Sequence, residues 1–380
     1  MTAGSSDPPT ITLGLPRMHK EPSERRDFLP EFVGRLARRG ASPVLEEGYG
    51  SGMGLSTDDY RQQAEGVRFA SRREVYQQPW VLVLRAPDAD ELDWMAPGSL
   101  LISMLHYPTR PQRVADLRQR GLEAISLDSL KDDSGRRLVE NLQAVAWNGV
   151  REAFKVLART YPAPGFASPQ RGPIRVTLLG AGAVGSHVVR TAAAYGDVDR
   201  RKRLAADGVR GVVTRVVDFD VTGDEAEMRR ILTETDLLVD ATQRPDPSQP
   251  VIPNDWIRSL PDHAVILDLS VDPYDCDRDP PYVKGIEGVP HGNLDQFIFP
   301  PDDPAYDRLP GCVEAGERRH ALSCYSWPGL EPAACMRHYG QQLRPILRML
   351  IERGGPQQVR ERGRFFERAV SRALLSRWEG

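Results

Sequence analysis

A glycine-rich turn near the middle of the chain has the spacing that binds phosphate groups. The stretch Val176-Thr-Leu-Leu-Gly-Ala-Gly-Ala-Val-Gly185 contains a short apolar run, the pattern GxGxxG and the start of a helix. The first glycine permits a tight turn, the second lets the backbone approach a pyrophosphate, and the third lets helix and strand pack closely. The open amides of the helix N-terminus then face the phosphates. We therefore expect a bound dinucleotide to contact Gly180, Gly182, Ala183, Val184 and Gly185.

Two acidic residues stand near the end of the next predicted strand, Val212 to Val221. Either Asp218 or Asp220 is placed to bind the diol of an adenosine ribose, and we assign Asp220 to this role. No arginine follows directly to hold a 2′-phosphate, so the pattern favours NAD over NADP. A further predicted strand, Asp236 to Thr242, brings Thr242 to the same edge as a cofactor contact.

Charged side chains also follow the predicted strands of the first 130 residues. Arg85 follows the apolar run 80–84, His106 follows 100–105, and Asp128 follows 124–127. Arg25 lies in the loop after a first strand at 11–15. Ligands of open α/β sheets bind beyond the carboxyl ends of the strands, so these four side chains are expected to converge on one crevice.

The elements that position these residues alternate between strand and helix, which is typical of a parallel α/β sheet. We expect two Rossmann-like, doubly wound domains, the first formed by residues 1–150 with 325–380 and the second by 151–324. A long helix, Leu138 to Ala158, connects them, and a buried strand is predicted at 264–272. Two amphipathic helices, 340–353 and 363–378, are expected to pack back on the first domain.

Composition excludes several classes of protein. The 380 residues are 40% hydrophobic and carry a net charge of −3, which gives no whole-chain electrostatic signal for nucleic acid. No apolar run approaches the roughly 20 residues of a membrane span. The stretch Met1 to Pro9 lacks the apolar core of a signal peptide, so we expect a cytoplasmic protein. The four cysteines have no spacing suited to zinc, and we expect reduced thiols and no metal.

The chain resembles the superfamily of alanine dehydrogenase, transhydrogenase and lysine-forming saccharopine dehydrogenase. Lys20-Glu-Pro-Ser-Glu-Arg-Arg-Asp-Phe-Leu-Pro30 fills the place of the family's K-E-x-x-x-E-x-R loop, and His106 matches the family histidine. Arg26 is an alternative to Arg25 in this motif. The resemblance implies a cleft between two domains, NAD on the second domain, and an amino-acid or keto-acid substrate in the cleft. Family members range from monomers to homo-oligomers.

Two further stretches are similar to the saccharopine branch. They are Asp128-Ser-Leu-Lys-Asp-Asp-Ser-Gly-Arg-Arg137 and Leu267-Asp-Leu-Ser-Val-Asp272. From the resemblance, Asp128 and Arg137 set a second amino-acid subsite or pair with each other. Asp272 faces the nicotinamide or orients the substrate amine, whereas Asp268 is an alternative with a structural role. His291 and Asn293, in the long loop 273–310, are weaker candidates on the substrate side.

One departure from the family changes the expected chemistry. The family's lysine-glutamate pair is Arg85-Ala86 here. Arginine stays protonated, so Arg85 is suited to clamp a carboxylate but not to shuttle protons. That leaves His106 as the general acid/base.

The resemblance and this departure together imply an NAD(H)-dependent oxidoreductase acting on the C–N bond of an amino or imino acid. The expected reaction joins a keto acid to an amino acid, as in saccharopine or opine formation, or reverses that step. The alternatives are oxidative deamination, as in alanine dehydrogenase, and a family member that binds NAD but is redox-neutral or non-catalytic.

Overall fold

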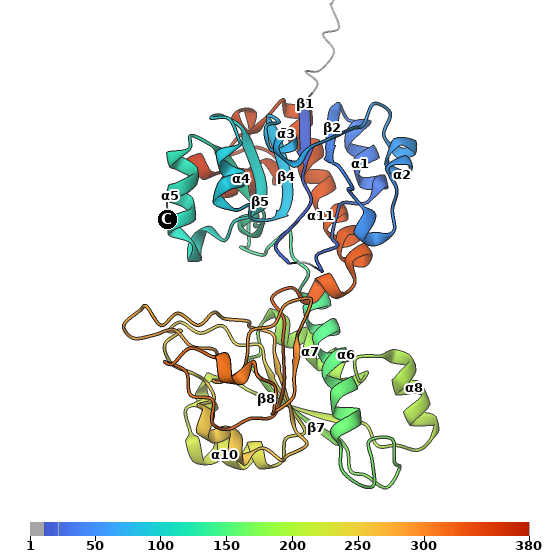
Figure 1. Cartoon of the computed structure of the whole chain (residues 1–380), viewed down its shortest axis with the longest axis vertical. Coiled ribbons are helices and arrows are strands. Elements are labelled where there is room, and N and C mark those ends of the chain that lie inside the picture. The colour runs from blue at the N-terminus through green and yellow to red at the C-terminus, as the bar shows by residue number, and fades with distance from the viewer. Residues whose placement is uncertain (1–10, 22, 380) are drawn as a thin grey trace, which may run out of the picture. The chain divides into compact units, whose positions relative to one another are not determined.

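The computed structural model describes residues 11–21 and 23–379 and divides the chain into two compact units (Figure 1). The first unit runs to Asn141 and resumes at Glu331, and the second runs from Leu142 to Leu330. The polar stretch Met1 to Pro9 lies outside the described residues. Within the described ranges, no helix has the length and apolar character needed to cross a bilayer.

The first unit is built on a six-stranded sheet in which every neighbouring pair is parallel. Its strand order, β3-β2-β1-β4-β5-β6, is that of a doubly wound fold. The strands are β1 (Ile11–Leu15), β2 (Ala41–Glu46), β3 (Arg68–Ala70), β4 (Trp80–Arg85), β5 (Leu100–Met104) and β6 (Glu123–Ser126). In β4 the first five residues are all buried. Such unbroken apolar runs are expected when helices cover both faces of a sheet.

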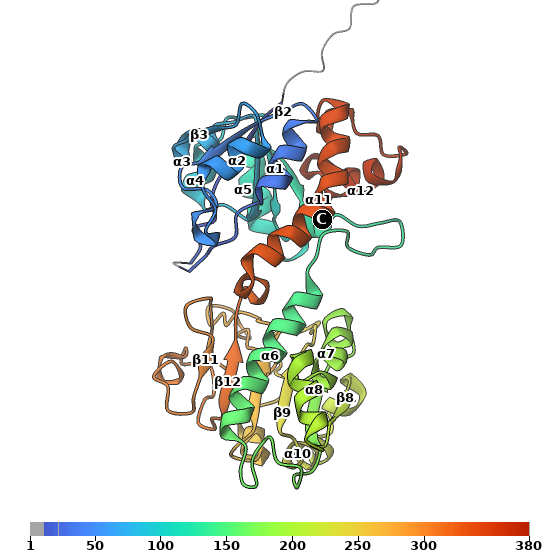
Figure 2. The same ribbon diagram turned by 90° about the vertical axis from the view of Figure 1, so that its right-hand side faces the viewer.

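Among the described residues, this unit has seven α-helices, five before the chain leaves it and two after it returns. They are α1 (Pro30–Ala37), α2 (Thr57–Gln63), α3 (Arg72–Tyr76), α4 (Ala89–Asp93) and α5 (Pro111–Gln119), with α11 (Pro332–Arg353) and α12 (Phe365–Ala373) from the C-terminal segment. The returning helix α11 lies beside α1 (Figure 2). A Cβ on Gly340 of α11 would lie 3.2 Å from the ring of Phe32 on α1, so glycine permits this close approach. The predicted return of the C-terminal helices to the first domain is confirmed.

The second unit holds another six-stranded sheet, ordered β11-β12-β10-β9-β7-β8, in which only β11 runs antiparallel to its neighbour. Its strands are β7 (Ile174–Leu179), β8 (Val212–Val217), β9 (Leu237–Asp240), β10 (Val265–Asp268), β11 (Ile298–Phe299) and β12 (His320–Ser323). Its helices are α6 (Leu142–Thr160), α7 (Ala183–Ala193), α8 (Val198–Ala206), α9 (Phe219–Thr222) and α10 (Glu225–Thr233). The long helix α6 packs against α7, β10 and β12. The predicted fold, two Rossmann-like parallel sheets, is therefore confirmed.

Several boundaries differ from the sequence prediction for physical reasons. The strand expected to reach Val221 ends at Val217, because Asp218 accepts a hydrogen bond from the Phe219 amide and begins α9. Helix α11 begins at Pro332 rather than Gly340, and a proline is favoured in the first turn of a helix. The short strands β3, β11 and β12 were not predicted.

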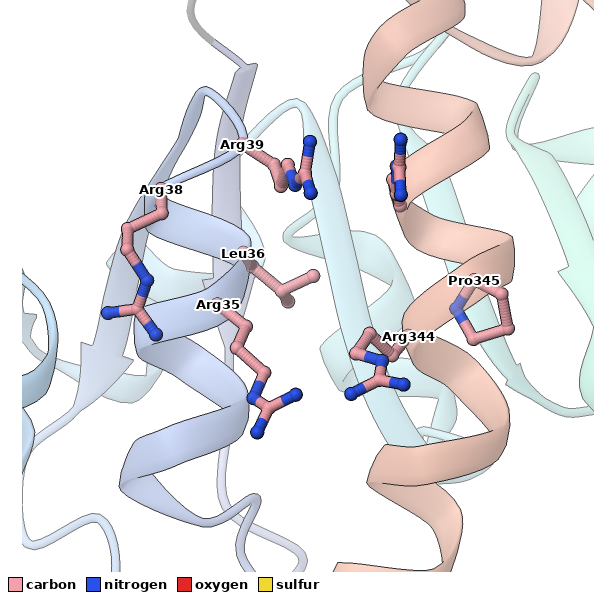
Figure 3. Close-up of a pocket in the computed structure, with 7 residues that line it drawn as sticks. Arg35, Leu36, Arg38, Arg39, Arg344 and Pro345 are labelled. Carbon is pink, nitrogen blue, oxygen red and sulfur yellow. The ribbon is translucent and has the colours of Figure 1, made fainter.

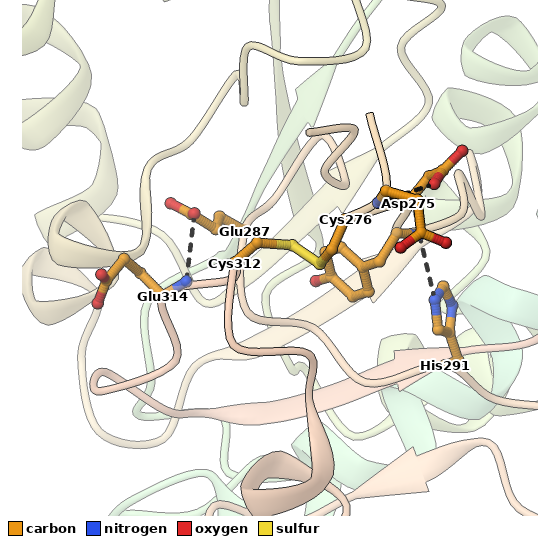
Figure 4. The surroundings of a disulfide bond; sticks show 8 residues. Asp275, Cys276, Glu287, His291, Cys312 and Glu314 are labelled. Atoms are coloured by element: carbon orange, nitrogen blue, oxygen red, sulfur yellow. Dashed lines mark hydrogen bonds between the residues drawn. A yellow bond between two sulfur atoms is a disulfide. The ribbon is translucent and has the colours of Figure 1, made fainter. Parts of the chain in front are cut away.

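The expectation of four reduced thiols was wrong. Cys276 and Cys312 form a disulfide, with their Cα atoms 5.9 Å apart (Figure 4). Cys324 and Cys335 are free and buried. The bond joins two parts of the long segment between β10 and β12 that are 36 residues apart.

Candidate functional site

The glycine-rich turn of the second unit has the geometry that its spacing predicts. Gly180 directly follows β7 with a φ of +86°, and a Cβ there would lie 2.9 Å from the carbonyl oxygen of Ala241. A Cβ on Gly185 would lie 2.3 Å from the carbonyl oxygen of Gly180. Both positions therefore require glycine to hold the turn against its neighbours.

Gly182 differs from the other two glycines because a Cβ there would have no described atom within 4 Å. It is the N-cap of α7, and no side chain caps this end of the helix. The amides of Ala183, Val184 and Gly185 are thus available to an anion, whereas the Ser186 amide donates to the carbonyl of Gly182. Thr242 lies beside the same turn, because its Cα would be 3.1 Å from a Cβ on Gly180. The residues present therefore fit the pyrophosphate of a dinucleotide.

The acidic residue for the adenosine ribose is better placed two residues earlier than our assignment of Asp220. Asp218 is the first residue after β8, where a Rossmann fold places this carboxylate, whereas Asp220 lies inside α9 with its side chain exposed. We therefore propose Asp218 as the ribose contact.

A buried cluster of ionisable groups at the carboxyl ends of β9 and β10 escaped the sequence prediction. Lys284 Nζ lies 2.6 Å from Asp268 Oδ2 and 2.9 Å from the hydroxyl of Ser323, and its side chain is 1% exposed. Burial raises the pKa of Asp268, but the charge and hydrogen bond of Lys284 outweigh burial and lower it. This buried ion pair fits the structural role given as the alternative for Asp268, which stays a prediction.

Asp240 completes this cluster. Its Oδ1 accepts hydrogen bonds from the amide and hydroxyl of Thr242, at 2.9 and 2.7 Å, while its buried Oδ2 has no partner among the described residues. A Cβ on Gly285 would lie 2.2 Å from this Oδ2, so the carboxyl packs against glycine. Burial and the charge of Asp268 raise the pKa of Asp240. Through these two hydrogen bonds, Asp240 holds Thr242 at the end of β9.

Asp272 lies next to this cluster, and the residue before it, Val271, has a strained backbone. Val271 has a φ of +53°, which is unusual for a β-branched residue, and its amide donates to Asp268 Oδ1 at 2.7 Å. Asp272 Oδ2 in turn accepts from Arg244 Nη2 at 2.8 Å. The carboxylate of Asp272 is one-third exposed and is held by this single ion pair with Arg244.

The two weaker loop candidates have local roles in the structure. The Tyr274 amide donates to His291 Nε2 at 3.4 Å, so Nδ1 carries the proton and donates to the Tyr325 hydroxyl at 2.9 Å. Burial, reinforced by the charge of Lys284, lowers the pKa of His291 to about 4. Asn293 caps a turn by accepting from the amides of Asp295 and Gln296.

In the first unit, β5 and β6 bring His106 and Asp128 together. His106 Nδ1 lies 3.3 Å from Asp128 Oδ2, and Asp128 Oδ1 accepts from the amides of Leu105 and His106. Burial raises the pKa of Asp128, but the hydrogen bond and charge of His106 outweigh it and hold this pKa well below its usual range. The imidazole is half-exposed, so its Nε2 is free to face a ligand.

Arg85 lies in an acidic environment at the end of β4. Its guanidinium pairs with Glu21 and lies 3.8 Å from Glu24 Oε2. Glu24 itself holds Arg26, whose Nε donates to it at 2.8 Å, and both of these side chains are buried. Arg25 points instead to the exposed surface. The structure therefore separates the two arginines of the motif into a buried, paired one and an exposed one.

Arg137 does not pair with Asp128, contrary to one of our two expectations. The partners of Asp128 are His106, Ser126 and backbone amides, as described above. Arg137 is exposed in a short hairpin, bridged to Lys131 through the backbone, and its side chain has no described partner.

Residues 14–146 match the family model described as Alanine dehydrogenase/PNT, N-terminal domain. The chain is also 22% identical to alanine dehydrogenase from Bacillus subtilis (strain 168) over 280 residues, covering 69% of this chain and 71% of that relative.

Solved structures agree on the fold. An L-alanine dehydrogenase matches with a TM-score of 0.71 at 20% identity, over 96% of this chain and 94% of that one. A transhydrogenase from Sinorhizobium meliloti matches with a TM-score of 0.61 at 17% identity, over 90% and 94%. These two matches show the fold alone, and a saccharopine-type reaction stays a prediction.

The segment 14–146 that matches this family model contains His106, Asp128, Arg85 and the Glu24–Arg26 pair, all at or beyond strand ends. Lys284 and Asp240 were missed in the other unit. A signal for Asp240 existed, because both Leu237-Leu-Val-Asp240 and Val265-Ile-Leu-Asp268 are apolar strands ending in aspartate. Lys284 gave only a weak signal as a lone lysine among apolar neighbours. Among the residues described, no group of three or more His, Cys, Asp or Glu side chains is arranged to hold a metal.

Proposed function

We propose that the chain is an NAD(H)-dependent oxidoreductase that acts on the C–N bond of a 2-amino acid by oxidative deamination. The observation that carries this proposal is the turn at Gly180, Gly182 and Gly185, in which two glycines are sterically required and the third leaves room for a ligand. The relatives named alanine dehydrogenase support the reaction class. Asp218, with no arginine directly after it, supports NAD rather than NADP.

The chemistry that bound NAD⁺ supplies is acceptance of a hydride from the substrate Cα, which leaves a C=N bond. Water then adds to that carbon, and loss of ammonia gives the 2-keto acid. His106 is suited to take the proton from this water and return it to the leaving amine. Asp128 holds Nδ1 of the imidazole, so Nε2 faces the substrate, and the anionic carboxylate stabilises the imidazolium form.

Arg85 is the proposed binder of the substrate carboxylate. A guanidinium offers two parallel donors to a carboxylate, and it keeps its charge throughout the cycle. Glu21 and Glu24 compete for the same donors. Because Arg26 is buried and paired with Glu24, Arg25 is the other available guanidinium in this loop.

A second candidate reaction is reductive condensation of a keto acid with an amino acid. It is favoured by the exposed hairpin that presents Arg137, a cation with no described partner that suits a second carboxylate. In this reaction the amino group of the second substrate replaces ammonia.

The test is a spectrophotometric assay of NADH oxidation by the purified full-length chain. One arm supplies pyruvate and other 2-keto acids with ammonia, and a second arm supplies the same keto acids with amino acids. Oxidation with ammonia alone would support deamination, whereas a strict need for an amino acid would move the assignment to condensation. NADH binding without oxidation in either arm would overturn both reactions and leave a redox-neutral or non-catalytic NAD protein.

A further inference from the structure

A groove rich in arginine runs between α1 and α11 of the first unit, away from the carboxyl ends of the strands. It has a volume of about 510 Å³ and is lined by Arg35, Leu36, Arg38, Arg39, Arg344, Pro345 and Arg348. Figure 3 shows the side chains of Arg35 and Arg344 extending into the space between the two helices. The volume is in the range of sites that bind small ligands.

The positive charge of this groove is largely uncompensated. Glu352 is shared by two of the arginines, at 3.7 Å from Arg39 and 2.6 Å from Arg348. Arg35 and Arg344 have no ion-pair partner among the described residues, and Arg38 donates to the backbone carbonyl of Gln63. Of the five arginines, only Arg39 and Arg348 thus have an ion-pair partner among the described residues, and they share it, in a chain whose net charge is −3.

Ordinary helix electrostatics explain only part of this arrangement. Arg35, Arg38 and Arg39 lie at the C-terminal end of α1, where the helix dipole favours cations. Arg344 and Arg348 lie within α11, at a spacing of four residues where two like charges repel each other. An anion bound between the helices would remove this repulsion.

The groove continues into a second hollow with a different lining. This hollow, of about 290 Å³, shares Arg35 and Arg344 with the first. Leu29, Phe32, Met336 and Gly340 form its apolar floor, and Glu31, Arg337 and Gln341 also line it. An apolar floor next to a cluster of guanidinium groups suits a ligand with a planar ring at one end and several phosphates at the other.

We propose that this groove binds an oligophosphate, with the phosphates held by Arg35, Arg39, Arg344 and Arg348. Two sources share this chemistry, a nucleoside triphosphate and an inorganic triphosphate. The site is separate from the dinucleotide turn, because the groove belongs to the first unit and the turn to the second. The proposal therefore does not depend on the reaction proposed above.

The test is calorimetric titration of the full chain with ATP and with inorganic triphosphate, in the presence of saturating NADH to block the dinucleotide site. The variant Arg35→Glu/Arg344→Glu is expected to weaken binding of both probes at least tenfold, since hydrogen bonds between charged groups are the strong ones. The matched control, Arg73→Glu/Arg362→Glu, reverses two exposed arginines of the same unit outside the groove and should stay within about twofold of the parent.

The outcomes separate the sources and can overturn the proposal. ATP binding much more tightly than inorganic triphosphate would support a nucleoside ligand, and equal affinity would support recognition of the phosphate chain alone. Failure of both probes to bind at about 1 mM, or an equal loss in the control variant, would overturn the proposal. If neither probe binds and sedimentation shows self-association that Arg35→Glu/Arg344→Glu abolishes, the groove is an interface between copies of the chain. An unchanged midpoint of thermal unfolding in both variants would show that they are folded.

Discussion

The Nδ1 atom of His106 lies 3.3 Å from a carboxylate oxygen of Asp128, although the two residues follow different strands. His106 also has a left-handed backbone, with a φ of +53°, which the two amide hydrogen bonds to Asp128 stabilise. One carboxylate therefore fixes both the ring and the backbone of the only histidine that we place in the chemistry.

Replacement of His106 by asparagine should lower kcat by about 10² or more, because it removes the acid/base group. Asparagine tolerates a left-handed backbone, so the turn should persist and thermal unfolding should change little. The measurement is the initial rate of NADH oxidation across pH 6 to 10, where the parent should show a dependence on pH that the variant lacks. A variant with the parent's rate would remove His106 from the mechanism.

A valine at Gly182 should weaken NADH binding at least about tenfold, because its side chain would occupy the space through which the backbone meets the pyrophosphate. The position has an extended backbone and no described atom within 4 Å of a Cβ, so valine is expected to fold normally. Gly211→Val is the matched control, since Gly211 lies equally open elsewhere in the same unit. Unchanged affinity at Gly182→Val, measured by fluorescence titration, would place the nucleotide elsewhere.

Local sequence patterns predicted those parts of the fold that follow general rules for strands, turns and the ends of parallel strands. The buried run 80–84 predicted β4, and the glycine spacing predicted the turn between β7 and α7. The position of His106 beside Asp128 also followed from local pattern, because both come directly after strands of one parallel sheet. Each of these features depends on residues close together in sequence or on neighbouring strands.

The features that the sequence did not reveal depend on distant partners. A lysine is rarely buried, and Lys284 becomes so only because Asp268, Ser323 and the carbonyl of Pro290 surround its ammonium group. Likewise, the separation of Cys276 from Cys312 carries no pairing information. The different roles of Arg25 and Arg26 also depend on the position of Glu24 relative to the buried core.

Replacement of Lys284 by methionine should destabilise the chain by about 3–5 kcal/mol, because it leaves Asp268 buried without its cation. Adding Asp268→Asn should recover part of this loss, since the remaining group is then neutral. Lys155→Met is the control, because Lys155 pairs with Glu152 at a partly exposed position and should cost less than about 1 kcal/mol. Urea unfolding measures all three variants. A similar loss for Lys155 and Lys284 would show that the buried pair contributes no more than a surface pair.

Replacement of Asp27 by asparagine should stabilise the chain more at pH 8 than at pH 5. Burial raises the pKa of Asp27 to about 7, while the Gly50 amide and Arg17 only partly offset this. The folded chain therefore retains a proton that the unfolded chain releases near pH 4. The stability linked to this proton is lost as pH rises through about 7.

We expect the melting temperature of Asp27→Asn to exceed that of the parent by at least about 2–4 °C more at pH 8 than at pH 5. Asp58→Asn, on an exposed helix, should show no such dependence, and an equal difference at both pH values would contradict the prediction.

Reduction of the Cys276–Cys312 disulfide should destabilise the second unit. Closing a loop of 36 residues restricts the unfolded chain, and the chain-entropy model gives about 4 kcal/mol for this length. The parent should unfold at a lower denaturant concentration when a reductant is present. The double variant Cys276→Ser/Cys312→Ser should unfold at that lower midpoint with or without reductant, because Cys324 and Cys335 are free thiols in either case. A parent that does not respond to reductant would mean that the two cysteines do not pair in solution, and that the segment between β10 and β12 is held by its hydrogen bonds alone.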